Sequence, residues 1–140
     1  MVEPMKKTKK EWKKALPPSV FHILVEKGTE PAFTGKYVDE QRTGIYHCAG
    51  CHNPLFHSSA KFHSGSGWPS FTQPVSKDAV DTKPDLSMGM RRIEVLCNHC
   101  GGHLGHVFND GPKPTGLRYC MNSAALSFHE ENKEKRGEKT

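Results

Sequence analysis

The sequence contains no long apolar run, and this absence argues against a membrane-spanning or a secreted protein. Only 34% of its 140 residues are hydrophobic, and they nowhere form the stretch of about 20 apolar residues that a membrane helix requires. An apolar segment of the kind found in secretion signals is also lacking. We therefore expect a cytoplasmic protein with no membrane partner, built as a single domain.

Cysteines are also scarce, and their spacing is informative. Four of the five form two C-x-x-C motifs, Cys48 with Cys51 and Cys97 with Cys100. Four thiolates complete the tetrahedral shell of a structural zinc ion, which would join two separate hairpins. A redox C-x-x-C motif would need a βαβ context, and disulfides would need an oxidising compartment. Three adjoining histidines are alternative ligands that a full cysteine set makes unnecessary: His47, His52 and His99.

Positive charge exceeds negative charge, and the formal net charge is +5. Much of the excess lies in lysines within residues 1–16. A solvated helix is the usual meaning of such a run, and the alternative is a zinc-bearing module that binds nucleic acid or a protein. Trp12 is the one aromatic residue among these lysines, and without a series of stacking rings we expect no nucleic-acid partner. We expect a lysine-rich segment over 1–16, one domain over 17–129, and a charged tail over 130–140 that frays from His129 onward.

Local patterns predict helices near the N-terminus and short strands afterwards. Apolar residues recur at helical spacing up to Pro17 and Pro18, which end the first helix. Ser19 is expected to cap a second helix that ends near Gly28. Further on, apolar or alternating runs separated by turn residues are typical of antiparallel strands. The clearest runs cover residues 44–47, 90–96 and 117–126.

The fifth cysteine, Cys120, is left over once the metal site is complete, and it is a candidate nucleophile. On a strand, Arg118, Cys120 and Asn122 would share one face, while Leu117, Tyr119 and Met121 would pack on the core. A nearby guanidinium favours thiolate over thiol, so we expect Arg118 to activate Cys120. The alternative is a rim strand with a solvent-facing cysteine.

Two closely spaced histidines precede this strand. His106, Phe108 and Asp110 would share a strand face, and His103 would join them if the strand is interrupted at Gly105. Paired imidazoles suggest proton transfer near neutral pH, although surface histidines are the alternative.

A third segment, Ser64–Phe71, surrounds Trp68 with two glycines and a proline. Such a loop presents an indole either as part of the core or as a pocket wall. If Trp68 is a wall, the pocket suits a methyl group or a thioether.

Taken together, these residues resemble the methionine-R-sulfoxide reductase (MsrB) family. The resemblance extends from about residue 26 to residue 128. It depends on the paired C-x-x-C motifs and on four blocks, Glu26–Glu30, Ser64–Phe71, Gly102–Phe108 and Arg118–Leu126. It implies a mainly β fold, in which two antiparallel sheets form an open barrel-like core with short N-terminal helices and a zinc site.

The resemblance also implies roles for the candidate residues. The implied catalytic positions are Cys120 as nucleophile, His103 and His106 on the sulfoxide oxygen, Arg118, Asn122, and Asp110 as a carboxylate that orients a histidine. The implied substrate-binding positions are Trp68 and Phe108. Members with both motifs bind Zn²⁺, here through Cys48, Cys51, Cys97 and Cys100. A zinc hydrolase or deaminase is a poorer interpretation, because four cysteines leave the metal no open position.

The implied reaction converts the R epimer of methionine sulfoxide, free or within a protein, to methionine. Attack by the Cys120 thiolate would give a sulfenic acid. Contacts of the methyl group with indole and of the oxygen with imidazole would select one epimer. Many family members carry a resolving cysteine where this chain has Ser66. We therefore expect a monomeric enzyme whose sulfenic acid is reduced by an external thiol such as thioredoxin.

Overall fold

A computed structural model describes residues 9–26, 28–86, 89, 91–113 and 115–131. Most of the strongly charged tail and the first lysines therefore lie outside the described residues. The helices are α1 (Lys9–Ala15) and α2 (Pro18–Leu24), with short 3₁₀ segments at Ser58–Ala60 and Ser123–Ala125. The strands are β1 (Gly44–Cys48), β2 (Pro54–His57), β3 (Lys61–Phe62), β4 (Ser70–Phe71), β5 (Val80–Asp85), β6 (Arg92–Cys97), β7 (His103–Phe108), β8 (Arg118–Met121) and β9 (Leu126–Glu130).

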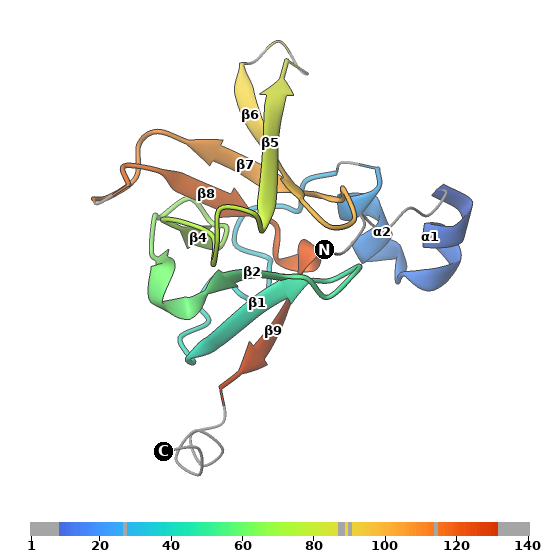
Figure 1. Ribbon diagram of the computed structural model, residues 1–140, viewed down its shortest axis with the longest axis horizontal. Coiled ribbons are helices and arrows are strands. Elements are labelled where there is room, and N and C mark those ends of the chain that lie inside the picture. The colour runs from blue at the N-terminus through green and yellow to red at the C-terminus, as the bar shows by residue number, and fades with distance from the viewer. Residues whose placement is uncertain (1–8, 27, 87–88, 90, 114, 132–140) are drawn as a thin grey trace.

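The strands form two antiparallel sheets, as predicted (Figure 1). The smaller sheet has the order β2-β1-β9, and the larger has the order β3-β4-β8-β7-β6-β5. Each sheet keeps two edge strands, so neither closes into a barrel within the part of the chain that the structure describes.

Aromatic rings form the centre of the core between the sheets. Tyr46, Phe56 and Phe71 are fully buried. The Phe71 ring stacks on Phe56 with centroids 4.4 Å apart and meets Tyr46 edge-on at 5.1 Å. Offset and edge-to-face pairs of this kind add to the free energy gained from burial alone. The core therefore holds β1, β2 and β4 in place, and β4 is the strand that pairs with β8.

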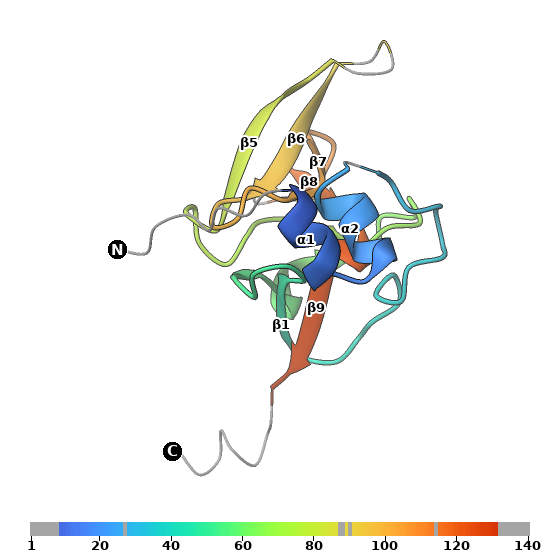
Figure 2. The ribbon, with the colours of Figure 1, turned by 90° about the vertical axis from the view of Figure 1, so that its right-hand side faces the viewer.

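The two helices cover one side of the sheets, as Figure 2 shows. Helix α2 packs beside β7 and the Ser123–Ala125 segment, and it buries Phe21, Ile23 and Leu24. The expected Ser19 cap is wrong. The helix begins at Pro18 with Pro17 as its N-cap and no side-chain cap, because proline already has the helical φ angle and needs no N–H partner.

The C-terminal part departs from its pattern in two places. The run over 117–126 is not one strand, because β8 ends at Met121 and a 3₁₀ turn precedes β9. Fraying from His129 is wrong for the first residues of that segment, since β9 extends to Glu130. There, Gly44 pairs with Glu130, and His57 contacts Glu131 at 2.7 Å. No helix among the described residues is long and apolar enough to cross a membrane.

Candidate active site and metal centre

A cavity of about 270 Å³ opens on the larger sheet and collects most of the predicted site. Six predicted residues line it: Trp68, His106, Phe108, Arg118, Cys120 and Asn122. The alternation predicted for β8 is therefore confirmed, since Met121 is fully buried in the core while Cys120 faces the cavity. Four lining residues were not predicted: Thr29, Ser66, Arg92 and Gly105.

Strand pairing between β7 and β8 aligns the reactive side chains. His106 lies directly opposite Cys120, and Phe108 lies opposite Arg118. Side chains of directly opposed residues point to the same face of a sheet. Gly105 permits this close pairing, because a Cβ there would overlap the carbonyl oxygen of Cys120. The glycine between the two histidines thus lets β8 approach β7.

An irregularity in β7 brings His103 near His106. The pairing of β7 with β6 shifts between Val95 and Leu96, so that Gly105 and His103 oppose successive residues of β6. The predicted interruption therefore lies at Leu104, one residue before Gly105. The two imidazole centroids are 5.3 Å apart. His103 is buried, however, and does not line the cavity.

A carboxylate contacts each of the two histidines, but neither carboxylate belongs to Asp110, the residue expected in this role. His106 Nε2 lies 2.7 Å from Asp85 Oδ2, and His103 Nδ1 lies 2.6 Å from Glu94 Oε2. Asp110, for which the resemblance implied this role, instead accepts two hydrogen bonds from Arg118, at 2.8 and 3.2 Å. Asp85 and Glu94 belong to β5 and β6, and only the pairing of these strands brings them to the site.

Arg118 acts on Cys120 in the expected direction, but burial of the sulfur acts against it. Burial raises the pKa of the Cys120 thiol above its usual value, which outweighs the opposing effects of Ser66 and Arg118. Arg118 is bonded to Asp110 and lies 4.4 Å above the Phe108 ring, so part of its charge is compensated. Burial thus favours the thiol form of Cys120 over the thiolate in the resting protein.

Glu30 fixes two walls of the cavity, a role that sequence reasoning missed. Its carbonyl oxygen accepts from the Trp68 indole at 2.9 Å, and its N–H donates to Asn122 Oδ1 at 3.0 Å. Its carboxylate accepts from the backbone N–H groups of Ser123 and Ala124 at 2.9 and 3.0 Å. The only signal in the sequence was its place in the Glu26–Glu30 block.

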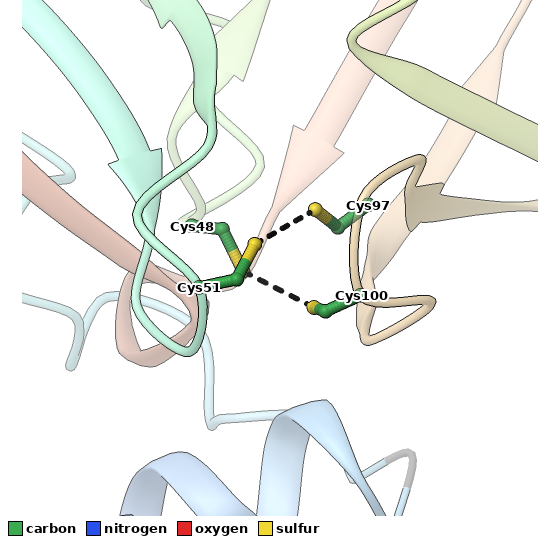
Figure 3. A group of neighbouring side chains, drawn as sticks. All are labelled: Cys48, Cys51, Cys97 and Cys100. Atoms are coloured by element: carbon green, nitrogen blue, oxygen red, sulfur yellow. Dashed lines mark hydrogen bonds between the residues drawn. The ribbon is translucent and has the colours of Figure 1, made fainter. Parts of the chain in front are cut away.

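The four cysteines of the C-x-x-C motifs converge at one point, where their sulfur atoms all lie within 4.8 Å of one another (Figure 3). The Sγ–Sγ distances are 3.7 Å between Cys48 and Cys100 and 3.5 Å between Cys51 and Cys97. A tetrahedral ion with bonds of about 2.3 Å would separate its sulfur ligands by about 3.8 Å, so the cluster fits such an ion. Among the described residues, no histidine joins this group.

The two motifs have matching backbone turns. In each, the N–H of the residue after the second cysteine donates to the carbonyl of the first, from His52 to Cys48 and from Gly101 to Cys97. Both of these residues have positive φ, 66° at His52 and 76° at Gly101. Helix α2 closes the site from outside, where the Leu24 side chain packs against Gly102. Two loops distant in sequence thus meet under the helix.

Comparison with known proteins identifies the family of this chain. Residues 16–130 match the SelR domain model. The chain is 58% identical over 125 residues to "Peptide methionine sulfoxide reductase MsrB" of Leptospira interrogans, covering 89% of this chain and 95% of that protein. A protein of the same name from Methanosarcina barkeri is 52% identical over 134 residues, covering 96% of this chain and 94% of the relative. The chain belongs to the SelR family, whose curated members include these MsrB proteins.

Proposed function

We propose that the protein reduces the R epimer of methionine sulfoxide to methionine, in proteins or as the free amino acid. The observation that carries this proposal is the cavity itself. It brings a thiol, an imidazole and an indole together at Cys120, His106 and Trp68. A methyl sulfoxide has three matching features, an electrophilic sulfur, a basic oxygen and an apolar methyl group.

Cys120 is the nucleophile in this proposal. Its thiolate attacks the sulfoxide sulfur while the oxygen is protonated, with His106 as the acid. The buried His103 packs against His106, with the ring centroids 5.3 Å apart, and helps to hold its imidazole in place. Asn122 and Arg118 are the other polar residues of the cavity in this proposal. In the net reaction the oxygen atom passes to Cys120 Sγ, which becomes a sulfenic acid. The cysteine sulfur loses two electrons and the methionine sulfur gains them.

Asp85 positions the acid. Its carboxylate contact with His106 Nε2 fixes the ring orientation, much as carboxylates orient imidazoles in other sites. Arg92 lies near the same carboxylate, with 3.7 Å between Arg92 Nη2 and Asp85 Oδ2. Asp110 holds Arg118 through two hydrogen bonds.

Epimer selection follows from which lining group meets each part of the substrate. Trp68 and Phe108 form an apolar wall for the substrate methyl group, and His106 offers the hydrogen bond for the oxygen. The S epimer, attacked at the same sulfur, would place its oxygen against the indole and its methyl group against the imidazole. An unpaired polar atom in a buried site costs about 1–3 kcal/mol, which disfavours this pose.

An external thiol completes the cycle. Ser66, 3.8 Å from Cys120 Sγ, has no thiol to form a disulfide, and the remaining cysteines belong to the metal cluster. Two external thiols, or one dithiol such as thioredoxin, would regenerate Cys120 and release water and a disulfide. The cysteine cluster would hold a structural Zn²⁺ that joins the two loops. We expect the enzyme to act as a monomer.

The test uses resolved R and S epimers of N-acetyl-methionine sulfoxide with dithiothreitol as reductant. The proposal predicts turnover of the R epimer alone, and a loss of R turnover of at least about 100-fold in Trp68→Ala. Equal turnover of both epimers by the wild-type protein would refute the assignment of the walls.

A further inference from the structure

Three serine hydroxyls connect the reactive sulfur to the backbone of the Trp68 loop. Ser66 Oγ lies 3.8 Å from Cys120 Sγ and 2.7 Å from Ser64 Oγ. Ser64 Oγ lies 2.7 Å from Ser70 Oγ, whose hydroxyl donates to the Trp68 carbonyl at 3.1 Å. Ser70 is fully buried and lies opposite Cys120 in the pairing of β4 with β8. We call Ser66, Ser64 and Ser70 the serine chain.

The carbonyl at its far end gives the serine chain a direction. A carbonyl oxygen can only accept, so Ser70 donates to it and has a lone pair free for Ser64. Ser64 can then donate to Ser70, Ser66 to Ser64, and the Cys120 thiol to Ser66. In this arrangement every hydroxyl hydrogen has an acceptor. The neutral thiol and the three serines therefore each have an acceptor for the hydrogen that they donate.

Loss of the thiol proton requires the opposite direction. A thiolate only accepts, so Ser66 must turn to donate to it. The two hydroxyl contacts of 2.7 Å then each keep a hydrogen only if Ser64 donates to Ser66 and Ser70 donates to Ser64. The Trp68 carbonyl then loses the Ser70 hydroxyl. The backbone N–H groups of Ser66 and Trp68 reach Ser64 Oγ and Ser66 Oγ at 3.2 and 3.4 Å, and they can keep these contacts in both arrangements. Because the chain ends on a carbonyl, it carries no proton away.

We propose that the serine chain controls the protonation of Cys120 by reversing the direction of its hydrogen bonds, with Ser66 as the positioning residue that donates to the thiolate. At rest the chain accepts from the thiol, and during turnover it donates to the attacking sulfur. This assignment deepens the proposed function, because it gives Ser66 a task beside the nucleophile. It needs only that Cys120 ionises.

The other charged and titratable side chains near the sulfur are left unchanged by the substitutions in the test that follows. They come from each strand beside the cavity: Asp85 on β5, Arg92 on β6, His106 on β7, Arg118 on β8, and Asp110 bonded to Arg118. None of them has a hydrogen bond to a serine of the chain among the contacts of the described residues. Substitution within the serine chain therefore changes the sulfur's environment without removing a charge.

The test measures the rate at which iodoacetamide alkylates Cys120 as a function of pH, in the metal-loaded, full-length protein. Peptide mass spectrometry separates Cys120 from the four other cysteines. Ser66→Ala removes the donor to the thiolate. A hydrogen bond to a charged group contributes more free energy than one to a neutral group, so the thiolate loses more than the thiol does. The apparent pKa of Cys120 should rise by about one unit, which is a ten-fold loss of thiolate at fixed pH below the pKa. Ser66→Thr keeps a hydroxyl, so the apparent pKa of Cys120 in this variant should stay close to the wild-type value.

Ser70→Ala supplies a result of opposite sign. It removes two hydrogen bonds from the thiol arrangement, Ser64 to Ser70 and Ser70 to the Trp68 carbonyl, but only one from the thiolate arrangement. The apparent pKa of Cys120 should therefore fall. A general loosening of the loop would move both variants in the same direction.

Two outcomes would overturn the proposal: an unchanged titration of Cys120 in Ser66→Ala, or a rise in both Ser66→Ala and Ser70→Ala. Alkylation does not depend on turnover, so the result is independent of the proposed function. An absence of methionine release by the wild-type protein would refute that function and leave the titration intact.

Discussion

Replacing Glu30 tests how the cavity walls are held in place. Its carboxylate accepts two backbone hydrogen bonds, from Ser123 and Ala124. Hydrogen bonds to a charged acceptor contribute about 1.5–3 kcal/mol each, and the part-buried site favours the lower value. Glu30→Ala leaves both N–H groups without this acceptor, so we expect a loss of about 3 kcal/mol. Glu30→Gln keeps one acceptor oxygen and should lose about half as much.

The measurement is urea unfolding of the metal-loaded protein, followed by circular dichroism. The matched control is Glu26→Ala, four residues earlier, whose carboxylate is about half exposed and contacts only the exposed His22 at 3.3 Å among the contacts of the described residues. Such a surface pair contributes about 0.3–0.5 kcal/mol. If Glu30→Ala and Glu26→Ala are equally stable to within about 1 kcal/mol, Glu30 does not anchor the 3₁₀ segment and the reasoning fails.

Four further predictions concern the metal, the strands and the sulfur. Removing the metal with a chelator should cost on the order of 5 kcal/mol or more of unfolding free energy, and unchanged thermal unfolding would contradict a structural role. Gly105→Ala should cost about 2–3 kcal/mol and reduce activity, because the new methyl group overlaps the Cys120 carbonyl; wild-type stability and rate would argue against the observed register. Ser66→Cys should form a disulfide with Cys120 after one turnover, seen by non-reducing peptide mapping, and a lasting free thiol at both positions would count against their proximity. Burial raises the pKa of Cys120, so the stability that comes from the neutral thiol is present below its usual value of 9.0 and is lost as pH rises through the higher folded value. Unfolding free energies of wild type and Cys120→Ser should therefore converge or cross at alkaline pH, and parallel profiles would contradict the shift.

The cavity position of Cys120 and the four-cysteine cluster could be predicted from the sequence because both depend on local rules. Alternation along a strand placed Cys120 and Arg118 on one face, and the C-x-x-C spacing identified a tetrahedral cysteine set. These features need only a few consecutive residues. The mainly β architecture likewise followed from the strand patterns and from the resemblance to MsrB proteins.

The partners of the histidines could not be predicted, because they depend on strand order. Asp85 and Glu94 reach His106 and His103 only because β5, β6 and β7 are neighbours in the larger sheet. The raised pKa of Cys120 could not be predicted from the sequence either. The nearby arginine was visible in the sequence, whereas the desolvation that outweighs it depends on how β4, β7 and β8 pack.

The end of β8 shows the same limit. An apolar pattern continues from residue 117 to residue 126, yet the chain turns after Met121. Asn122 bonds there to Glu30 and to the Leu104 carbonyl, and Glu30 caps the following N–H groups. A glutamate 92 residues away in the chain therefore contributes to the break. Only the tertiary structure reveals this contact.

The central claim is that the Cys120 sulfur removes the sulfoxide oxygen, and a single-turnover experiment without reductant tests it most directly. Mixing the protein with excess R sulfoxide and quenching in acid should release one equivalent of methionine and leave one oxygen atom on Cys120, detected with a sulfenic-acid trap. Cys120→Ser should release none while it keeps its fold and its metal. Full methionine release by Cys120→Ser would contradict the account.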